Sequence, residues 1–376
     1  MTVLTNARIV LENEVVHGHV AVEDGRILAV GEGPARGEDM EGDTLIPGLV
    51  ELHTDHLEVH VAPRPMVKWN TLAAIQAHDA QIAASGITTV LDALRVGYPD
   101  HSVITTAVSR SLADEIMAAQ AAGRLRAEHR FHLRCEVSEE ITIPDFELFD
   151  DLEGIVLVSL MDHTPGQRQF RYLDAYRAYY QGRNGMSDEA FEAFQAERKA
   201  RAARWSDPNR RELAARARQR GYVVASHDDA TEAHVAEAVR DGVTLAEFPT
   251  TVEAAEASRA AGMRILMGGP NLVRGGSHSG NVSAGELADR GALDILSSDY
   301  VPFSMLQGAF VLGEREGWTL PRAIATVTSG PAAAIGLSDR GRIAEGLRAD
   351  LVRVRREGRG DVPVVRSVWR EGRRVA

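Results

Sequence analysis

The middle of the chain alternates short apolar runs with longer alanine-rich stretches, and this alternation limits the possible folds more than any other feature. The runs are rich in β-branched residues and bounded by glycine or polar residues, as buried strands are. The stretches between them have the spacing of amphipathic helices. Eight strand–helix units predict a (β/α)8 barrel, which takes about 250 residues. The predicted strands are residues 46–53, 87–93, 131–137, 155–161, 222–227, 243–248, 263–268 and 293–299, and the predicted helices include 71–85, 107–122, 230–240, 252–261 and 320–335.

The two ends of the chain have a different pattern. Each consists of short segments of alternating polarity separated by turn-forming residues, so the ends can pair as one sheet with the middle of the chain inserted between them. We therefore predict a β-sandwich domain from residues 1–46 and 338–376, and a barrel domain from residues 47–337. A long insertion at residues 164–220 separates the fourth and fifth strands and carries an arginine-rich helical stretch from 188 to 220.

Composition limits the classes of protein and partner. The 376 residues carry a formal net charge of −12, which disfavours a general nucleic-acid binder. The single cysteine, Cys135, rules out an intrachain disulfide and suits a reducing compartment. The chain begins without a basic-then-apolar leader pattern, and no run approaches the roughly 20 apolar residues of a membrane span. We therefore expect a soluble cytoplasmic protein without nucleic-acid or membrane partners.

Residues able to bind a metal ion follow the predicted strands one after another. The first strand leads into His53 and Asp55, which point the same way if the strand continues to them. A single histidine at a strand end is more often a hydrogen-bonded loop residue, but so many ligand types at successive strand ends favour one shared site at the mouth of a barrel over an open doubly wound sheet. Imidazole and carboxylate together suit Zn²⁺ or Mn²⁺, as one ion or two. The later candidates are Glu136, His163, His227 with Asp228 and Asp229, Glu247 and Asp299, whereas Asp92 also fits a helix cap or a supporting role.

Basic and glycine-rich loops accompany these strand ends. Arg64 and Lys68 follow the first strand within a proline-containing loop, and Arg168 lies near the start of the insertion, with Arg171 close behind it. Glycines let backbone N–H groups approach an anion, and an arginine fork can bind two phosphate oxygens. The glycine-rich loop alone is equally a flexible turn, and each basic residue alone is more often a solvated surface charge. Repeated from three loops near the mouth, they suggest a polyanionic substrate. The glycine-rich segment 268–281, after the seventh strand, contributes Asn271, Arg274, Ser277 and His278.

These motifs together resemble the amidohydrolase superfamily. They are the His53-x-Asp55 pair and residues 226–229, 247–251, 271–281 and 298–302. The resemblance implies a metal-bearing (β/α)8 barrel with a β-sandwich built from both termini. By position it implies that His53 and Asp55 hold a first metal, that Glu136 bridges and that His227 holds a second. Asp299 would bind metal and accept a proton from the attacking water. The His-x-Asp pair departs from the commoner His-x-His, and Glu247 stands where many members have histidine, which makes His163 the substitute ligand.

The same resemblance also implies a reaction. The expected substrate is alpha-D-ribose 1-methylphosphonate 5-triphosphate, hydrolysed to 5-phosphoribose 1-methylphosphonate and diphosphate in phosphonate catabolism by the carbon–phosphorus lyase pathway. Asp299 would be the base and His278 a general acid or hydrogen-bond donor, and a homo-oligomer is compatible with the sequence. The rival is a cyclic-amide hydrolase or deaminase on the same barrel, and a barrel without catalysis is disfavoured because the ligands are present. The expected substrate-binding residues are Arg64, Lys68, Arg168, Asn271, Arg274 and Ser277.

Overall fold

The central part of the chain forms a nearly closed barrel of parallel strands. The computed structural model describes residues 1–98, 104–168, 187–277 and 280–376. Eight strands follow one another around the barrel in chain order, each hydrogen-bonded in parallel to the next. The predicted (β/α)8 architecture is therefore confirmed. The strands are β6 (Leu49–Thr54), β7 (Ile87–Val96), β8 (Glu128–Glu136), β9 (Ile155–Met161), β10 (Val223–His227), β11 (Leu245–Glu247), β12 (Arg264–Gly268) and β13 (Ile295–Ser297).

The last strand meets the first through a few specific contacts. Thr54 and Asp299 form a parallel bridge, and the Asp299 N–H donates to the His53 carbonyl at 3.0 Å. The buried side chain of Glu51 accepts from the backbone N–H groups of His53 and Ser298, both at 2.6 Å. Burial raises the pKa of Glu51 to about 8. This carboxyl group thus ties β6 to the residues that follow β13.

Helices cover the outside of the barrel, and many begin at side chains typical of N-caps. Asn70, Ser187 and Thr231 each accept a hydrogen bond from a backbone N–H of the first helical turn. A large apolar cluster fills the space between strands and helices. The helices are α1 (Leu57–Val61), α2 (Thr71–Ala84), α3 (Thr106–Ala121), α4 (Thr142–Glu147), α6 (Asp188–Gln219), α7 (Glu232–Arg240), α8 (Val252–Ala260), α9 (Gly269–Arg274), α10 (Ala284–Asp289), α11 (Ser304–Gly313), α12 (Leu320–Ala325) and α13 (Ser329–Ala334).

Both ends of the chain combine in a second sheet, as the sequence predicts. Its order is β16-β15-β14-β5-β1-β2-β3, with β4 beside β1, so that β5 and β14 join the two ends. The Ile27 N–H donates to the Leu347 carbonyl, and the Ala349 N–H donates to the Gly25 carbonyl. These bonds connect the edge strand β3 to the segment that leads into β14. The sheet curls around an apolar core of its own. The strands are β1 (Thr2–Val10), β2 (Val15–Glu23), β3 (Arg26–Glu32), β4 (Glu38–Asp39), β5 (Thr44–Pro47), β14 (Leu351–Arg355), β15 (Val364–Arg370) and β16 (Arg373–Arg374).

Residues 46–53, predicted as one strand, belong to two. β5 ends at Pro47 in the terminal sheet, and β6 begins at Leu49 in the barrel. Gly48 lies between them and donates its N–H to the Asp350 carbonyl at 2.7 Å. A Cβ on Gly48 would lie 2.3 Å from Thr88 Oγ1, so the crossing leaves no room for a side chain. We propose this residue as the N-terminal boundary between the two domains.

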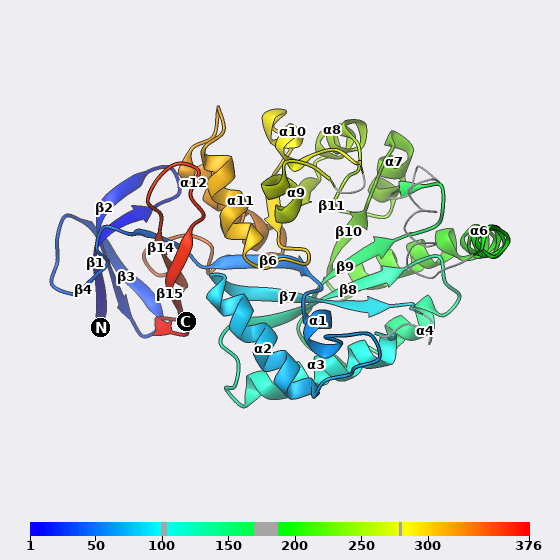
Figure 1. Cartoon of the computed structure of the whole chain (residues 1–376), viewed down its shortest axis with the longest axis horizontal. Coiled ribbons are helices and arrows are strands. Elements are labelled where there is room, and N and C mark those ends of the chain that lie inside the picture. Colours follow the sequence, from blue (N-terminus) through cyan, green and yellow to red (C-terminus); the bar gives the residue numbers. More distant parts are fainter. Residues whose placement is uncertain (99–103, 169–186, 278–279) are drawn as a thin grey trace.

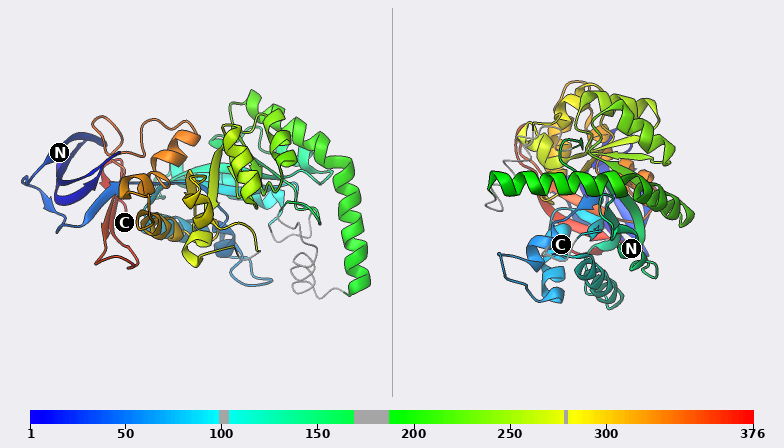
Figure 2. Two further views of the ribbon diagram at one scale, coloured as in Figure 1. Left: turned by 90° about the horizontal axis from the view of Figure 1, so that it is seen from above. Right: turned by 90° about the vertical axis from the view of Figure 1, so that its right-hand side faces the viewer.

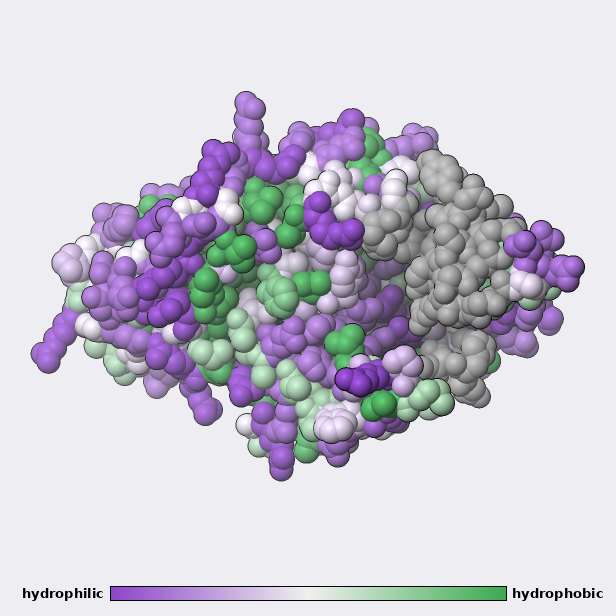
Figure 3. Space-filling view, viewed as in Figure 1, coloured by the Kyte–Doolittle hydropathy of each residue, from purple (hydrophilic) through white to green (hydrophobic). Residues whose placement is uncertain are grey.

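The terminal sheet and α6 lie at opposite ends of the molecule (Figures 1 and 2). The terminal sheet lies at the end where the barrel strands begin, and the strands run toward the end that carries α6. The helical stretch predicted at 188–220 is confirmed as α6. Arg171, earlier in the insertion, falls outside the described residues. No described helix combines the length and apolar character of a membrane span. Hydrophilic side chains dominate the surface over the terminal sheet (Figure 3).

Candidate active site

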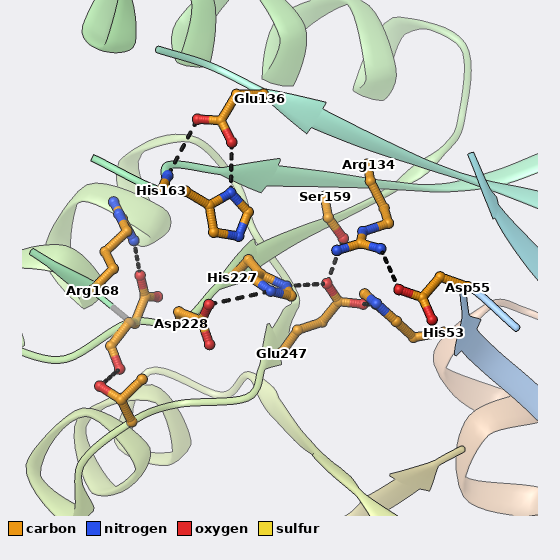
Figure 4. A network of polar contacts seen from close by, with 12 residues as sticks. His53, Asp55, Arg134, Glu136, Ser159, His163, Arg168, His227, Asp228 and Glu247 are labelled. Atoms are coloured by element: carbon orange, nitrogen blue, oxygen red, sulfur yellow. Dashed lines mark hydrogen bonds and ion pairs between the residues drawn. The ribbon is translucent and has the colours of Figure 1, made fainter. Parts of the chain in front are cut away.

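The carboxyl ends of the barrel strands bring the predicted ligand residues together (Figure 4). His53 lies at the carboxyl end of β6, Glu136 is the last residue of β8, and His227 is the last residue of β10. His163 follows β9 and Asp299 follows β13. His53, Glu136 and His227 are buried, and His163 and Asp299 are half-buried. The loops after parallel strands form the reactive face of such barrels, so this mouth is the candidate active site.

One group at the mouth has the geometry of a metal site. Ligand atoms of His163, His227 and Asp228 all lie within 4.8 Å of one another. Asp228 Oδ2 lies 3.3 Å from His227 Nε2, is buried, and has no hydrogen-bond partner among the described residues. A buried carboxylate oxygen without a partner is costly unless a cation faces it. The residues present therefore fit a divalent metal ion.

Glu136 is in direct contact with His163. Its Oε2 lies 2.6 Å from His163 Nδ1, and its Oε1 accepts from the Ser138 hydroxyl at 2.6 Å and from the His163 N–H at 3.2 Å. Burial raises the pKa of Glu136, but His163 and Arg198 outweigh it and lower the pKa to about 2. A carboxylate that binds one ring nitrogen orients the other nitrogen for a metal. Whether Glu136 bridges metals stays a prediction.

A second group lies deeper in the barrel, around Glu247. This buried carboxylate lies 3.2 Å from Nδ1 of His53 and 3.2 Å from Nδ1 of His227. Ser159 donates to it at 2.5 Å, and His132 lies 3.8 Å away. Burial raises the pKa of Glu247, but the surrounding imidazoles dominate and hold the pKa well below its ordinary value. The sixth-strand glutamate is thus in contact with two predicted ligand histidines.

Asp55 pairs with Arg134, a half-buried arginine of β8, and its charge also acts on Asp299. Arg134 Nη1 lies 3.1 Å from Asp55 Oδ2, and Arg134 Nε is buried without a hydrogen-bond partner in the part of the chain that the structure describes. Burial and the charge of Asp55 raise the pKa of Asp299 to about 7. An Asp299 carboxyl group with a raised pKa is suited to take up a proton near neutral pH.

A third His/Asp group lies outside the barrel, between α2 and the strands. Asp92 Oδ1 lies 2.8 Å from His78 Nε2, and Asp92 Oδ2 lies 2.7 Å from His129 Nδ1. His129 also contacts Asp79 at 3.3 Å. Burial lowers the pKa of His129, but Asp92 and Asp79 outweigh burial and raise the pKa to about 9. Both Asp92 carboxylate oxygens are therefore engaged by histidines, one from α2 and one from β8. Asp92 thus connects the helix layer to the strands and does not face the mouth.

The predicted substrate-binding residues do not all lie free at the mouth. Arg168 is buried in ion pairs with Asp229 and, at 2.7 Å, with Glu237, so two carboxylates already engage it. The Asn271 side chain accepts from Ala284 N at 2.8 Å and donates to Val282 O at 3.3 Å, which holds the loop together. Ser277 is half-buried at the end of the described part of that loop, and His278 lies outside the described residues. Among the predicted substrate-binding residues, Arg64, Lys68 and Arg274 are exposed cations.

Two residues of the site, His132 and Arg134, were missed from the sequence. His132 and Arg134 lie on β8, two and four residues before Glu136, and side chains two apart share a face of a strand. That alternation was readable and could have identified both. Asp228 is among the sequence candidates beside His227, but the resemblance assigns no ligand role to it. Its turn toward the same group depends on a left-handed backbone, with φ of 59°, which no local pattern predicts.

The comparisons with known proteins agree with this geometry. A model of the amidohydrolase family matches residues 65–376. The chain is 50% identical to alpha-D-ribose 1-methylphosphonate 5-triphosphate diphosphatase of Escherichia coli (strain K12), over 99% of this chain and 100% of that one. It is 25% identical to an imidazolonepropionase of Streptomyces coelicolor (strain ATCC BAA-471 / A3(2) / M145), over 99% of this chain and 98% of that one.

Solved structures show the same fold at low sequence identity. N-acetylglucosamine-6-phosphate deacetylase from Thermotoga maritima superposes with a TM-score of 0.62 and 14% identity, over 100% of this chain and 99% of that one. 5-Methylcytosine deaminase from Klebsiella pneumoniae superposes with a TM-score of 0.64 and 17% identity, over 100% of this chain and 98% of that one. The resemblance drawn from the motifs is confirmed: this chain belongs to the amidohydrolase family.

Proposed function

We propose that this chain hydrolyses alpha-D-ribose 1-methylphosphonate 5-triphosphate to 5-phosphoribose 1-methylphosphonate and diphosphate, with a divalent metal ion as cofactor. The observation that carries the proposal is the 50% identity to a diphosphatase named for that substrate, over nearly the whole of both chains. The buried carboxylates and imidazoles at the barrel mouth support it. The cytoplasmic location and a homo-oligomer stay predictions from the sequence.

The proposed metal ligands are the residues that the strand ends bring together. His163, His227 and Asp228 form one group with ligand geometry. The sequence predicts His53, Asp55, Glu136 and Asp299 as further ligands. Zn²⁺ fits this mixture of nitrogen and oxygen donors, and Mn²⁺ is the alternative, as one ion or two. Such an ion supplies an acidified water as the nucleophile and Lewis acidity toward phosphoryl oxygens.

The chain's own groups handle the proton and the phosphate charge. In the proposed reaction Asp299 accepts the proton of the attacking water as the bond to the phosphorus nearest the ribose forms. Diphosphate then leaves with the electrons of the broken P–O bond. Arg134, half-buried beside Asp55, is the proposed cation for this phosphoryl group. The exposed Arg64, Lys68 and Arg274 are proposed to hold the outer phosphates, since phosphoryl transfer depends on positioning and charge neutralisation.

Diphosphate release from purified, metal-analysed protein tests the proposal. The substrates compared are the ribose methylphosphonate triphosphate, ATP and dihydroorotate. We expect diphosphate from the first, loss of activity with a chelator, and recovery when Zn²⁺ or Mn²⁺ is added back. Ring opening of dihydroorotate by metal-loaded protein that releases no diphosphate would replace the proposal with the cyclic-amide reaction.

A further inference from the structure

Glu247 connects the imidazoles on two sides of the barrel (Figure 4). It ends β11, and only 1% of its surface is exposed. Its Oε1 lies 3.2 Å from His53 Nδ1, and its Oε2 lies 3.2 Å from His227 Nδ1. The two imidazole rings are stacked with centroids 5.6 Å apart. One carboxylate therefore faces the same nitrogen of both rings.

The hydrogen bonds beneath Glu247 have only one consistent set of directions. An ionised carboxylate can only accept, so the Ser159 hydroxyl donates its single hydrogen to Glu247 Oε2 at 2.5 Å. The Ser159 oxygen is then left to accept from His132 Nε2 at 2.5 Å, which makes His132 the Nε2–H tautomer. By the same rule His53 and His227 both present Nδ1–H to Glu247. Their Nε2 atoms keep the lone pairs.

We propose that Glu247 is a positioning residue that holds His53 and His227 together as Nδ1–H tautomers, so that Nε2 of each is the nitrogen that binds metal. This inference rests on the metal of the proposed function. Metal-binding histidines commonly donate their other ring N–H to a carboxylate, which fixes tautomer and orientation. Here one carboxylate does so for two ligands from strands β6 and β10 at once. Glu247 supports the site in this way without being a ligand itself.

The carboxylate cannot be replaced by an amide of the same shape. A glutamine has one acceptor oxygen and one NH2 group, so it can accept from only one of the two Nδ1–H groups. The other imidazole would face a donor and would change to the Nε2–H tautomer. That histidine would then lose the lone pair on Nε2. Glu247→Gln should therefore release one ligand with little change in volume.

The rival arrangement makes Glu247 itself a ligand. His53, His132 and Glu247 also have ligand atoms within 4.8 Å of one another. A metal there would bind His53 through Nδ1, the nitrogen that faces Glu247. The two arrangements thus predict metal on opposite nitrogens of the same ring. Nitrogen NMR of the histidine side chains tells these nitrogens apart.

The experiment uses the full-length protein labelled with ¹⁵N histidine, before and after loading with Zn²⁺. We expect His53 and His227, assigned by single substitutions, to be Nδ1–H tautomers without metal and to bind Zn²⁺ through Nε2. Chelator competition should show that Glu247→Gln binds Zn²⁺ about 10–100-fold more weakly, as for other losses of such supporting carboxylates. One imidazole of that variant should change tautomer.

Asp92→Asn is the matched control, because Asp92 is also a buried carboxylate between two imidazoles but lies outside the mouth. It should lower thermal stability and leave Zn²⁺ affinity unchanged. Metal on Nδ1 of His53, or Nε2–H tautomers of His53 and His227 in the wild-type protein, would overturn the inference even if Glu247→Gln fails to fold. The tautomers are measured without substrate, so a failed diphosphatase assay with correct tautomers would count only against the proposed function.

Discussion

At the scale of single residues, three non-glycine residues with left-handed backbone follow barrel strands. Asp228, Phe248 and Asp299 have φ angles of 59°, 52° and 54°. Each donates its N–H to a carbonyl of the next strand around the barrel, at 2.9, 2.8 and 3.0 Å. Such conformations cost about 1–3 kcal/mol each and persist where surrounding contacts over-determine them. The barrel hydrogen bonds therefore hold two carboxylates of the mouth in place.

Asp299→Asn should lower kcat by at least about 100-fold, because an amide cannot accept the proton in general-base catalysis. The circular dichroism spectrum should match that of the wild type, since the backbone bridge to Thr54 does not need the carboxylate. Asp289→Asn, on the surface of α10, is the control and should keep full activity. An Asp299→Asn protein with wild-type kcat in the diphosphate-release assay would exclude Asp299 as the base.

Arg134 is half-buried and Arg168 is buried, and the two arginines near the mouth also differ in their partners. Arg134 faces one carboxylate and keeps Nε without a partner among the described residues, whereas Arg168 is held by Asp229 and Glu237. Arg134→Lys should raise KM for the triphosphate about tenfold, because a lysine cannot replace the arginine fork. Arg168→Lys should lower the melting temperature and leave KM unchanged. The reverse pattern in steady-state kinetics would return phosphate binding to Arg168.

At the scale of elements, the decisive feature is the passage of one extended segment from the terminal sheet into the barrel. Gly48 makes this passage between β5 and β6, against Thr88 and Asp350. An added Cβ would lie 2.3 Å from Thr88 Oγ1 and 3.0 Å from Asp350 Cβ, so both sheets would have to shift. The two halves of the molecule are therefore coupled at a residue without a side chain.

Gly48→Ala should destabilise the protein by about 1–3 kcal/mol, the usual cost of overpacking a filled interior. Gly358→Ala is the control, since its nearest neighbour would be Asp361 Oδ2 at 3.9 Å. Denaturant unfolding of both variants measures the difference. Equal midpoints for Gly48→Ala and Gly358→Ala would show that the crossing adapts without cost.

At the scale of the whole molecule, Glu128 connects the C-terminal segment to the barrel. It begins β8 and accepts from Arg340 at 2.7 Å and from Arg348 at 2.5 Å. Burial raises the pKa of Glu128, but the two arginines outweigh it and lower the pKa to about 2. All three side chains are mostly buried, so solvent screens the pairs only in part. The charge of Glu128 thus helps to dock the two domains.

The pH dependence of stability follows from the sign of this shift. A carboxyl group whose pKa falls from 4.5 to about 2 on folding stabilises the protein above pH 4.5, and this contribution disappears as pH falls from 4.5 toward 2. The full contribution is about 3 kcal/mol at about 1.4 kcal/mol per pKa unit, before screening. Glu128→Gln should be less stable than wild type at pH 7, and the gap should narrow below pH 4.5. The exposed Glu12, paired with Arg342, gives the control Glu12→Gln, which should change little at any pH. A gap that stays constant down to pH 3 would contradict the prediction.

The sequence alone predicted the parts of this protein that depend on local patterns. Hydrophobic period and alanine-rich spacing located each barrel strand and several of the helices, because period and length are written in neighbouring residues. Residues 320–335, predicted as one helix, form α12 and α13. The barrel then followed, and with it the convergence of His53, His227 and Asp299, since parallel strands bring their ends to one mouth. The pairing of the two chain ends followed from the same local alternation.

Only the tertiary structure decided which of these side chains face one another. Glu247 contacts histidines 194 and 20 residues away in the sequence, and Arg134 faces a carboxylate 79 residues away. The sequence suggests Arg168 as a phosphate-binding residue, whereas in the structure it forms ion pairs with Asp229 and Glu237. The reason is physical: period and propensity act over a few residues, whereas hydrogen bonds and ion pairs across a barrel depend on the direction in which each strand end points its side chain.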